Sequence, residues 1–352
     1  MVWSVVVSPS FLVFFSVSLM GTLLVLVSSG LLGMWLCLEL AFFGFIPILN
    51  GKGSFENEAA SKYFVVQSVG SGILLVSFMM ISSYNSLVVS NMLSVLVNAL
   101  MLIGFLIKLG VFPMHFWFPS VMSSSSWFSC FWLSVMQKIG PFWGVSGLGM
   151  GGVLVKVFMV LAIVTSLVGA VGGLAQVQFR PLLAYSSLGQ MGWMTSLLFL
   201  NLEVFIYYMV LYSLLLTGLL MGLFSVSSQS VTSSPGWSDV KGVIFWVFSG
   251  SYFMSLAGVP FMAGFVLKFA GVLVLINQFP FYLAVLMFTS MVSLYFYLSM
   301  MISSMVCVGS MTYSSFLGHL LGNNVSLFII VLCSLNLFGG LPLFLMCGMI
   351  MG

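Results

Sequence analysis

The amino-acid sequence predicts an all-α, polytopic membrane protein, and three observations support this class. Of the 352 residues, 62% are hydrophobic and only 4% are charged. The apolar residues form about eleven segments, most of them close to the ~20 residues that a helix needs to cross a bilayer. The polar connections are short, so none can fold independently. We therefore expect a single membrane domain over 1–352 that contacts the lipid bilayer.

Turn-forming and polar residues mark the ends of the expected helices. The boundaries are 11–28, 31–49, 62–82, 91–119, 127–147, 153–175, 182–200, 203–225, 242–278, 281–305 and 325–349. The first segment has no basic leader and no convincing cleavage site, which favours a membrane helix over a removable signal. The longest connection is the polar stretch at 225–241.

The basic residues outside the helices predict the orientation. If the helices alternate in direction, Lys52, Lys62, Arg180 and Lys241 lie on the side of the N-terminus, and only Lys156 lies on the other side. Positive loop residues favour the cytoplasmic or matrix face. We therefore expect the N-terminus there and, after eleven crossings, the C-terminus opposite.

Two of the expected segments are long and interrupted. Pro113 and Pro119 lie in the fourth, where each removes a backbone donor and disfavours helix at the preceding residue. Gly258, Pro260 and Gly264 are expected to interrupt the ninth segment as well. Backbone groups freed at membrane depth must be satisfied by protein or by cavity water, so such breaks indicate a buried polar site.

The spacing of the two interrupted segments suggests an internal repeat. They lie five helices apart, and a repeat of five helices reverses its direction in the membrane. This predicts inverted-topology five-helix repeats at 11–147 and 153–305, with a final helix at 325–349 outside them.

Three lysines interrupt long apolar runs. Lys108 and Lys268 adjoin the two broken segments, and Lys138 is central in the fifth. Each charge opposes insertion by ~3 kcal/mol, so the expense indicates a function in charge movement. The alternative is that each lysine extends to the headgroups. An amine held away from water can exchange a proton near neutral pH, so lysines joined by water can form a proton relay.

Glu39 is the acidic member of this predicted set. It lies in the apolar run LLGMWLCLELAFFGF, where a carboxylate needs a partner or a proton. Lys108 is the best candidate partner, because it belongs to a nearby interrupted segment. Pairing would hold Lys108 charged, and separation would favour loss of its proton. The alternative is a protonated carboxyl that is bonded to a backbone carbonyl.

Several polar residues are candidate accessories. His115 follows the first break and could deliver protons or bond a freed carbonyl. Gln190, Ser186 and Ser187 lie in the seventh segment, where they could order water or serve helix packing.

The remaining motifs exclude other classes of function. The five cysteines are widely spaced in apolar stretches, so we expect neither a disulfide nor a metal site. The glycines at 147–152 match a nucleotide-binding pattern, but no strand precedes them. The net charge of +3 is too dispersed for a nucleic-acid surface, and no cofactor motif is present in this chain.

Six short motifs carry a resemblance to a known family. They are KYFVVQ at 62–67, KLGVFPMHFW at 108–117, QKIGP at 137–141, LAYSS at 183–187, MGWM at 191–194, and GVP at 258–260 followed by Lys268. In this order they resemble the antiporter-like membrane subunits of mitochondrial respiratory complex I, the NADH:ubiquinone oxidoreductase.

The resemblance implies a proton-translocating subunit of the inner mitochondrial membrane. Its pairing glutamate would be Glu39, and its pump, central and distal lysines would be Lys108, Lys138 and Lys268. The implied partners are other membrane-arm subunits, including sister antiporter-like chains. FMN, iron–sulfur clusters and ubiquinone would belong to other subunits, where NADH is oxidised and the quinone reduced.

Departures from the family and alternative functions remain. Ser120 and Pro181 stand where the family usually has glutamate and lysine, and Gln190 replaces a frequent histidine, which removes a titratable group. A free-standing Mrp-like cation/proton antiporter would share the broken helices and lysines. A third hypothesis is a scaffold helix bundle that holds neighbouring subunits and whose lysines have no transport function.

Overall fold

The computed structural model describes residues 9–51, 53–84, 91–147, 152–226, 240–260 and 262–308, together with residues 336 and 340. Within these residues the chain is helical and contains no β-strand. It divides into two compact units, Met1–Thr165 and Ser166–Gly352. All of the predicted eleventh segment at 325–349 except residues 336 and 340, most of the connection at 225–241, and Lys52 lie outside the described residues.

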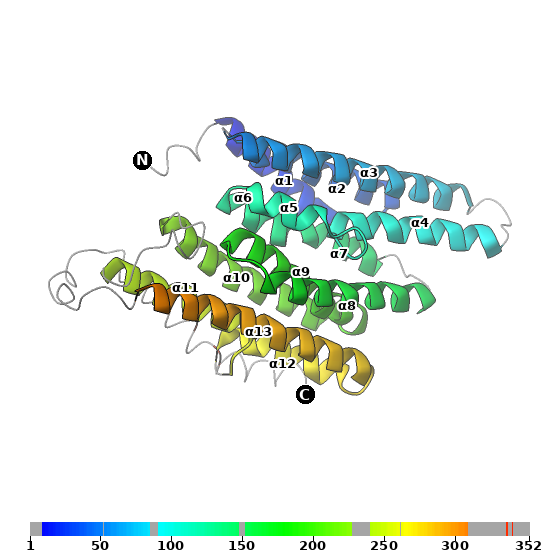
Figure 1. Cartoon of the computed structure of the whole chain (residues 1–352). Coiled ribbons are helices and arrows are strands. Elements are labelled where there is room, and N and C mark those ends of the chain that lie inside the picture. Colours follow the sequence, from blue (N-terminus) through cyan, green and yellow to red (C-terminus); the bar gives the residue numbers. More distant parts are fainter. Residues whose placement is uncertain are drawn as a thin grey trace. The chain divides into compact units, whose positions relative to one another are not determined.

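The first unit begins with three long helices, α1 (Pro9–Val27), α2 (Leu31–Leu49) and α3 (Ser54–Tyr84). Consecutive helices of this group pack side by side, α1 on α2 and α2 on α3 (Figure 1). Next come α4 (Asn91–Leu109), α5 (Trp117–Ser124) and α6 (Trp127–Phe131). A π-helical turn at Trp132–Met136 joins α6 to α7 (Gln137–Gly147), and α8 (Gly152–Leu174) crosses the boundary between the units.

The second unit contains α9 (Phe179–Leu200), α10 (Leu202–Val226), α11 (Val240–Ala257), α12 (Ala263–Leu275) and α13 (Pro280–Val308). Helix α9 is almost entirely buried and contacts α10, α12 and α13. Polar side chains on α9 therefore lie inside this unit rather than against lipid.

Six described helices are long and apolar enough to cross a membrane: α1, α2, α3, α8, α10 and α13. Two shorter apolar helical stretches, Val95–Leu109 in α4 and Ala263–Leu275 (α12), adjoin the two interruptions. The class of polytopic helical membrane protein is therefore confirmed, whereas the count of eleven crossings and the repeats stay predictions.

The two interruptions lie where the sequence predicts them and share one geometry. Gly110 and Gly258 have φ values of +69° and +82°, which glycine adopts without steric cost. After α4, the N–H of Val111 donates to Leu106 O (2.9 Å), and after α11 the N–H of Val259 donates to Met254 O (3.2 Å). Each glycine N–H also donates to the carbonyl three residues earlier, which completes a Schellman motif at both breaks.

Three details of the sequence-based prediction are wrong. Pro119 does not break a helix: it lies in the first turn of α5, where its missing N–H would have no helical partner. Gly264 likewise lies inside α12, where an added Cβ would meet the backbone of Ser255. Helix α3 begins at Ser54 rather than at 62. The polar residues before 62 also form helical turns, and the apolar pattern used to place the start does not include them.

Candidate functional site

Glu39 and Lys108 form a buried ion pair in the first unit. Lys108 Nζ lies 3.4 Å from Glu39 Oε1, and both side chains are buried. Lys108 occupies the last turn of α4, where the negative end of the helix dipole also favours a cation. The Phe42 ring lies 5.9 Å from the ammonium. The predicted contact is therefore present, and extension of Lys108 to the headgroups is excluded by its burial.

The carbonyls at the end of α4 receive side-chain donors. Trp117 Nε1 donates to Ile107 O at 3.1 Å, and Gln67 Nε2 lies 3.4 Å from Lys108 O. These contacts supply partners for groups that a continuous helix would have bonded itself. His115 is buried within the same break, with its ring against those of Phe112 and Phe116.

A small cavity of about 10 Å³ adjoins Lys108 and is lined by Thr22, Gln67 and Gln137. The Gln137 side chain forms hydrogen bonds with groups on three helices, α1, α2 and α3. Tyr63 donates to its Oε1 at 3.1 Å, and its Nε2 lies 3.3 Å from both Ser18 Oγ and Ala41 O. This volume matches about one water, so the cavity suits a water that contacts Lys108.

Lys138 follows Gln137 and lies at the start of α7. Only 2% of it is exposed, and its Nζ has no hydrogen-bond partner among the described residues. The face of the Phe118 ring lies 4.7 Å from Nζ. The sequence pattern predicts one helix over 127–147. In the structure a π-helical turn at 132–136 interrupts the α-helix and directly precedes this site. Such turns are frequent at functional sites.

Lys268 is the buried cation of the second unit. Its Nζ donates to Ala257 O, the carbonyl at the end of α11. An added Cβ at Gly258 would lie 2.7 Å from Lys268 Cδ, so glycine leaves the space through which this side chain passes. The ammonium thus caps the C-terminal end of α11, where the break leaves backbone carbonyls without helical partners.

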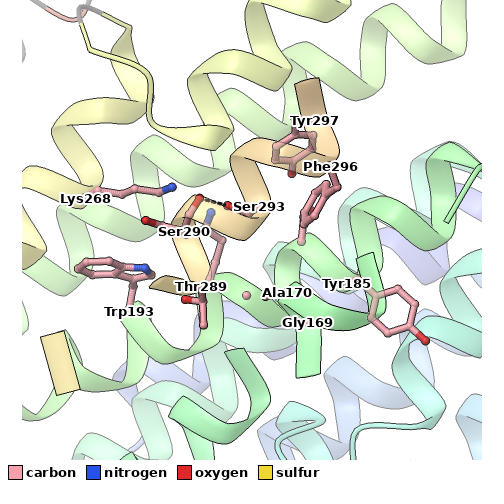
Figure 2. Close-up of a pocket in the computed structure, with 13 residues that line it drawn as sticks. Gly169, Ala170, Tyr185, Trp193, Lys268, Thr289, Ser290, Ser293, Phe296 and Tyr297 are labelled. Atoms are coloured by element: carbon pink, nitrogen blue, oxygen red, sulfur yellow. Dashed lines mark hydrogen bonds between the residues drawn. The ribbon is translucent and has the colours of Figure 1, made fainter. Parts of the chain in front are cut away.

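A second small cavity, about 10 Å³ in volume, lies beside Lys268. Figure 2 shows the residues that line it. Its polar lining comes from α9 and α13, and includes Ser186, Gln190, Ser290, Ser293 and Tyr297. The hydroxyls of Ser290 and Ser293 donate to carbonyls of their own helix, so their oxygens remain able to accept. The cavity can hold a water that accepts from Lys268 or donates to these oxygens.

The other accessories are placed by α9. Gln190 is buried and accepts a hydrogen bond from Tyr208 on α10. Ser187 lies outside the cavity lining and donates to Ala184 O at 2.8 Å. The structure therefore brings Gln190 and Ser186 to Lys268, whereas Ser187 is placed deeper in the unit.

Sequence reasoning missed several residues of these sites. Phe118, Tyr63, Tyr208 and Tyr297 are aromatic residues among many, and nothing in their spacing distinguishes them from packing residues. Their roles arise from contacts between helices that are distant in sequence. Among the described residues no group of His, Cys, Asp or Glu could hold a metal ion.

Broken apolar helices with buried lysines at the breaks define a class of ion-translocating membrane protein. Comparison with known proteins supports this class. Residues 28–296 match the model of the transmembrane family described as NADH:quinone oxidoreductase/Mrp antiporter. The chain belongs to this family.

Its curated relatives include proteins named NADH-ubiquinone oxidoreductase chain 2. The Lumbricus terrestris protein is 34% identical over 85% of this chain and 88% of its own length. The Mytilus edulis protein is 35% identical, with coverages of 84% and 88%. The resemblance predicted from the short motifs is therefore confirmed.

Solved structures share the fold. Respiratory complex I from Thermus thermophilus contains a chain with a TM-score of 0.78 and 22% identity, covering 95% of this chain and 79% of that one. A chain of the Mrp complex from Dietzia sp. has a TM-score of 0.71 and 18% identity, covering 81% and 58%.

Proposed function

We propose that this chain is an antiporter-like membrane-arm subunit of a mitochondrial NADH:ubiquinone oxidoreductase, and that it translocates protons across the inner membrane. The observation that carries the proposal is the buried pair of Glu39 and Lys108 beside a broken helix. A buried ion pair is weak evidence for stability but can serve as a switch between two charge states. The assembly is proposed from the relatives, which are named NADH-ubiquinone oxidoreductase chain 2.

In the proposed mechanism, Glu39 holds Lys108 charged, and separation of the two groups favours release of the lysine proton. The Gln137 cavity places a water-sized space next to Lys108. Lys138 is the central member of the relay and Lys268 is the distal member. His115, Gln190, Ser186 and Ser187 are proposed as accessories that order water or deliver protons.

The assembly supplies the driving reaction. NADH oxidation and ubiquinone reduction are assigned to other subunits, which hold FMN and the iron–sulfur clusters. This chain contributes the proton path and contacts sister antiporter-like chains and lipid. Eleven crossings are proposed, organised as inverted five-helix repeats at 11–147 and 153–305 within one membrane domain, with the N-terminus on the matrix side.

Replacement of Lys138 by methionine tests the relay. Methionine has a similar reach but binds no proton, and it removes the ~3 kcal/mol cost of inserting a charge. The variant should therefore assemble at least as well as the parent, while coupled quinone reduction and pumping fall sharply. A scaffold would show unchanged activity, and a Lys138→Met complex with an undiminished proton-to-electron ratio would contradict the relay.

Co-migration distinguishes the antiporter alternative. A chain of the Dietzia Mrp complex shares the overall fold, with a TM-score of 0.71. A complex I subunit should migrate in a large membrane assembly with NADH dehydrogenase activity, as detected in a native gel. A free-standing antiporter would instead migrate alone or with cation-transport partners.

A further inference from the structure

The three buried lysines differ in what supports their charge. Lys108 has the carboxylate of Glu39, and Lys268 has the carbonyl of Ala257. Lys138 has no hydrogen-bond partner among the described residues, although it is 2% exposed. The contact that the structure gives its ammonium is the face of Phe118, 4.7 Å from Nζ to the ring centroid.

Phe118 is held firmly in this position. It is 1% exposed and lies in the first turn of α5, where its N–H donates to His115 O at 3.1 Å. The preceding residue, Trp117, bonds Ile107 O at the end of α4. At the break, an added Cβ on Gly110 would lie 3.4 Å from Phe118 Cβ, which is ordinary contact distance. The ring is therefore fixed by the same break that follows Lys108.

An aromatic face attracts a cation within about 6 Å of its centroid, and the attraction grows when water is excluded. The Phe118–Lys138 distance lies well inside this limit, and both groups are buried. A neutral amine gains no comparable electrostatic attraction from the ring. The contact thus favours one of the two charge states between which a relay lysine must change.

We propose that Phe118 is a positioning residue for Lys138: its ring holds the ammonium at the start of α7 and stabilises the charged state during proton transfer. The inference rests on the proposed relay function of Lys138. It also gives the break at 110–116 a second role, because Lys108 and Phe118 lie on either side of it. Displacement of this segment would alter the supports of both lysines.

Four single variants of the assembled complex, reconstituted in sealed vesicles, test the proposal. Phe118→Leu removes the aromatic face, and Phe118→Tyr retains it. Phe78→Leu is the matched control, because Phe78 is also fully buried in the first unit and is paired with the ring of Phe105. Lys138→Met is the reference for loss of the relay. Rates of proton uptake during NADH oxidation are normalised to the amount of assembled complex.

We expect Phe118→Leu to slow proton uptake by roughly 2-fold to 30-fold, the range set by the strength of a cation–π contact. Phe118→Tyr should recover most of the parental rate, and Phe78→Leu should retain it. Parental uptake in Phe118→Leu beside a defective Lys138→Met would overturn the inference and leave the relay standing. Equal losses in both Phe118 variants, or an equal loss in Phe78→Leu, would assign the effect to packing and also overturn it. Parental uptake in Lys138→Met would instead reject the proposed function.

Discussion

At the scale of single residues, each buried lysine depends on a different kind of partner. A carboxylate faces Lys108, a helix-terminal carbonyl faces Lys268, and an aromatic ring faces Lys138. The desolvation of an ammonium is expensive, so each partner offsets part of that cost. Changes at the partners should therefore alter proton transfer without removing any lysine.

Replacement of Glu39 by glutamine removes the counter-charge of Lys108 while preserving the side-chain volume. Proton pumping should fall more than assembly, as measured by proton uptake and by native gel in the same membranes. Glu58→Gln is the control, because the pair of Glu58 with Lys62 at 2.6 Å is exposed and should contribute at most about 1 kcal/mol. Normal pumping at normal turnover in Glu39→Gln would show that the pair is not a switch.

Replacement of Gly258 by alanine combines two effects. The left-handed φ of +82° costs an L-residue about 1–2 kcal/mol, and the new Cβ would displace Lys268 from Ala257 O. Gly110→Ala carries only the first effect, since its nearest neighbours lie at 3.4 Å. We expect both variants to lose stability in thermal melts of the complex, and Gly258→Ala to lose more pumping per assembled complex. Equal pumping in the two variants would contradict the role of Gly258 in placing Lys268.

At the scale of helices, the first pair depends on close backbone contact. Gly44 of α2 meets the backbone of Ser18 on α1, with an added Cβ 2.5 Å from Ser18 N, and Ser18 Oγ donates to Ala41 O at 3.1 Å. Small residues allow such approaches in membrane bundles, where packing rather than hydrophobic burial associates helices. The same helix α2 carries Glu39, so its distance from α1 also positions the ion pair.

Replacement of Gly44 by alanine should separate α1 from α2 and cost about 1–3 kcal/mol through overpacking. Less assembled complex should then appear in a native gel, with a lower melting temperature. Gly33→Ala on the same helix has no neighbour within 4 Å and should be neutral or slightly stabilising, because alanine favours a helix by about 1 kcal/mol over glycine. An equal effect of both substitutions would refute the packing argument.

At the scale of the whole molecule, the alternation of helices gives a topology that labelling can test. Asn57, near the start of α3, and Asn277, between α12 and α13, are both exposed and fall on opposite sides of the predicted arrangement. A cysteine at 57 should react with an impermeant maleimide from the matrix side, and a cysteine at 277 from the intermembrane side. The reverse pattern, or access to the 225–241 connection from the intermembrane side, would overturn the orientation.

The sequence by itself determined the class of fold, the two breaks and the four charged residues, because each leaves a local signal. A long apolar run, a glycine–proline pair or a lysine inside such a run is visible without knowing its neighbours. The tertiary structure decided what those residues contact. Pro119 is compatible with helix α5 because it lies in the first turn, and the contact of Lys138 on α7 with the Phe118 ring on α5 is visible only in the packed structure. Such contacts depend on how helices that are distant in sequence pack together. Composition, periodicity and spacing along the chain do not reveal which of these helices lie next to each other in space.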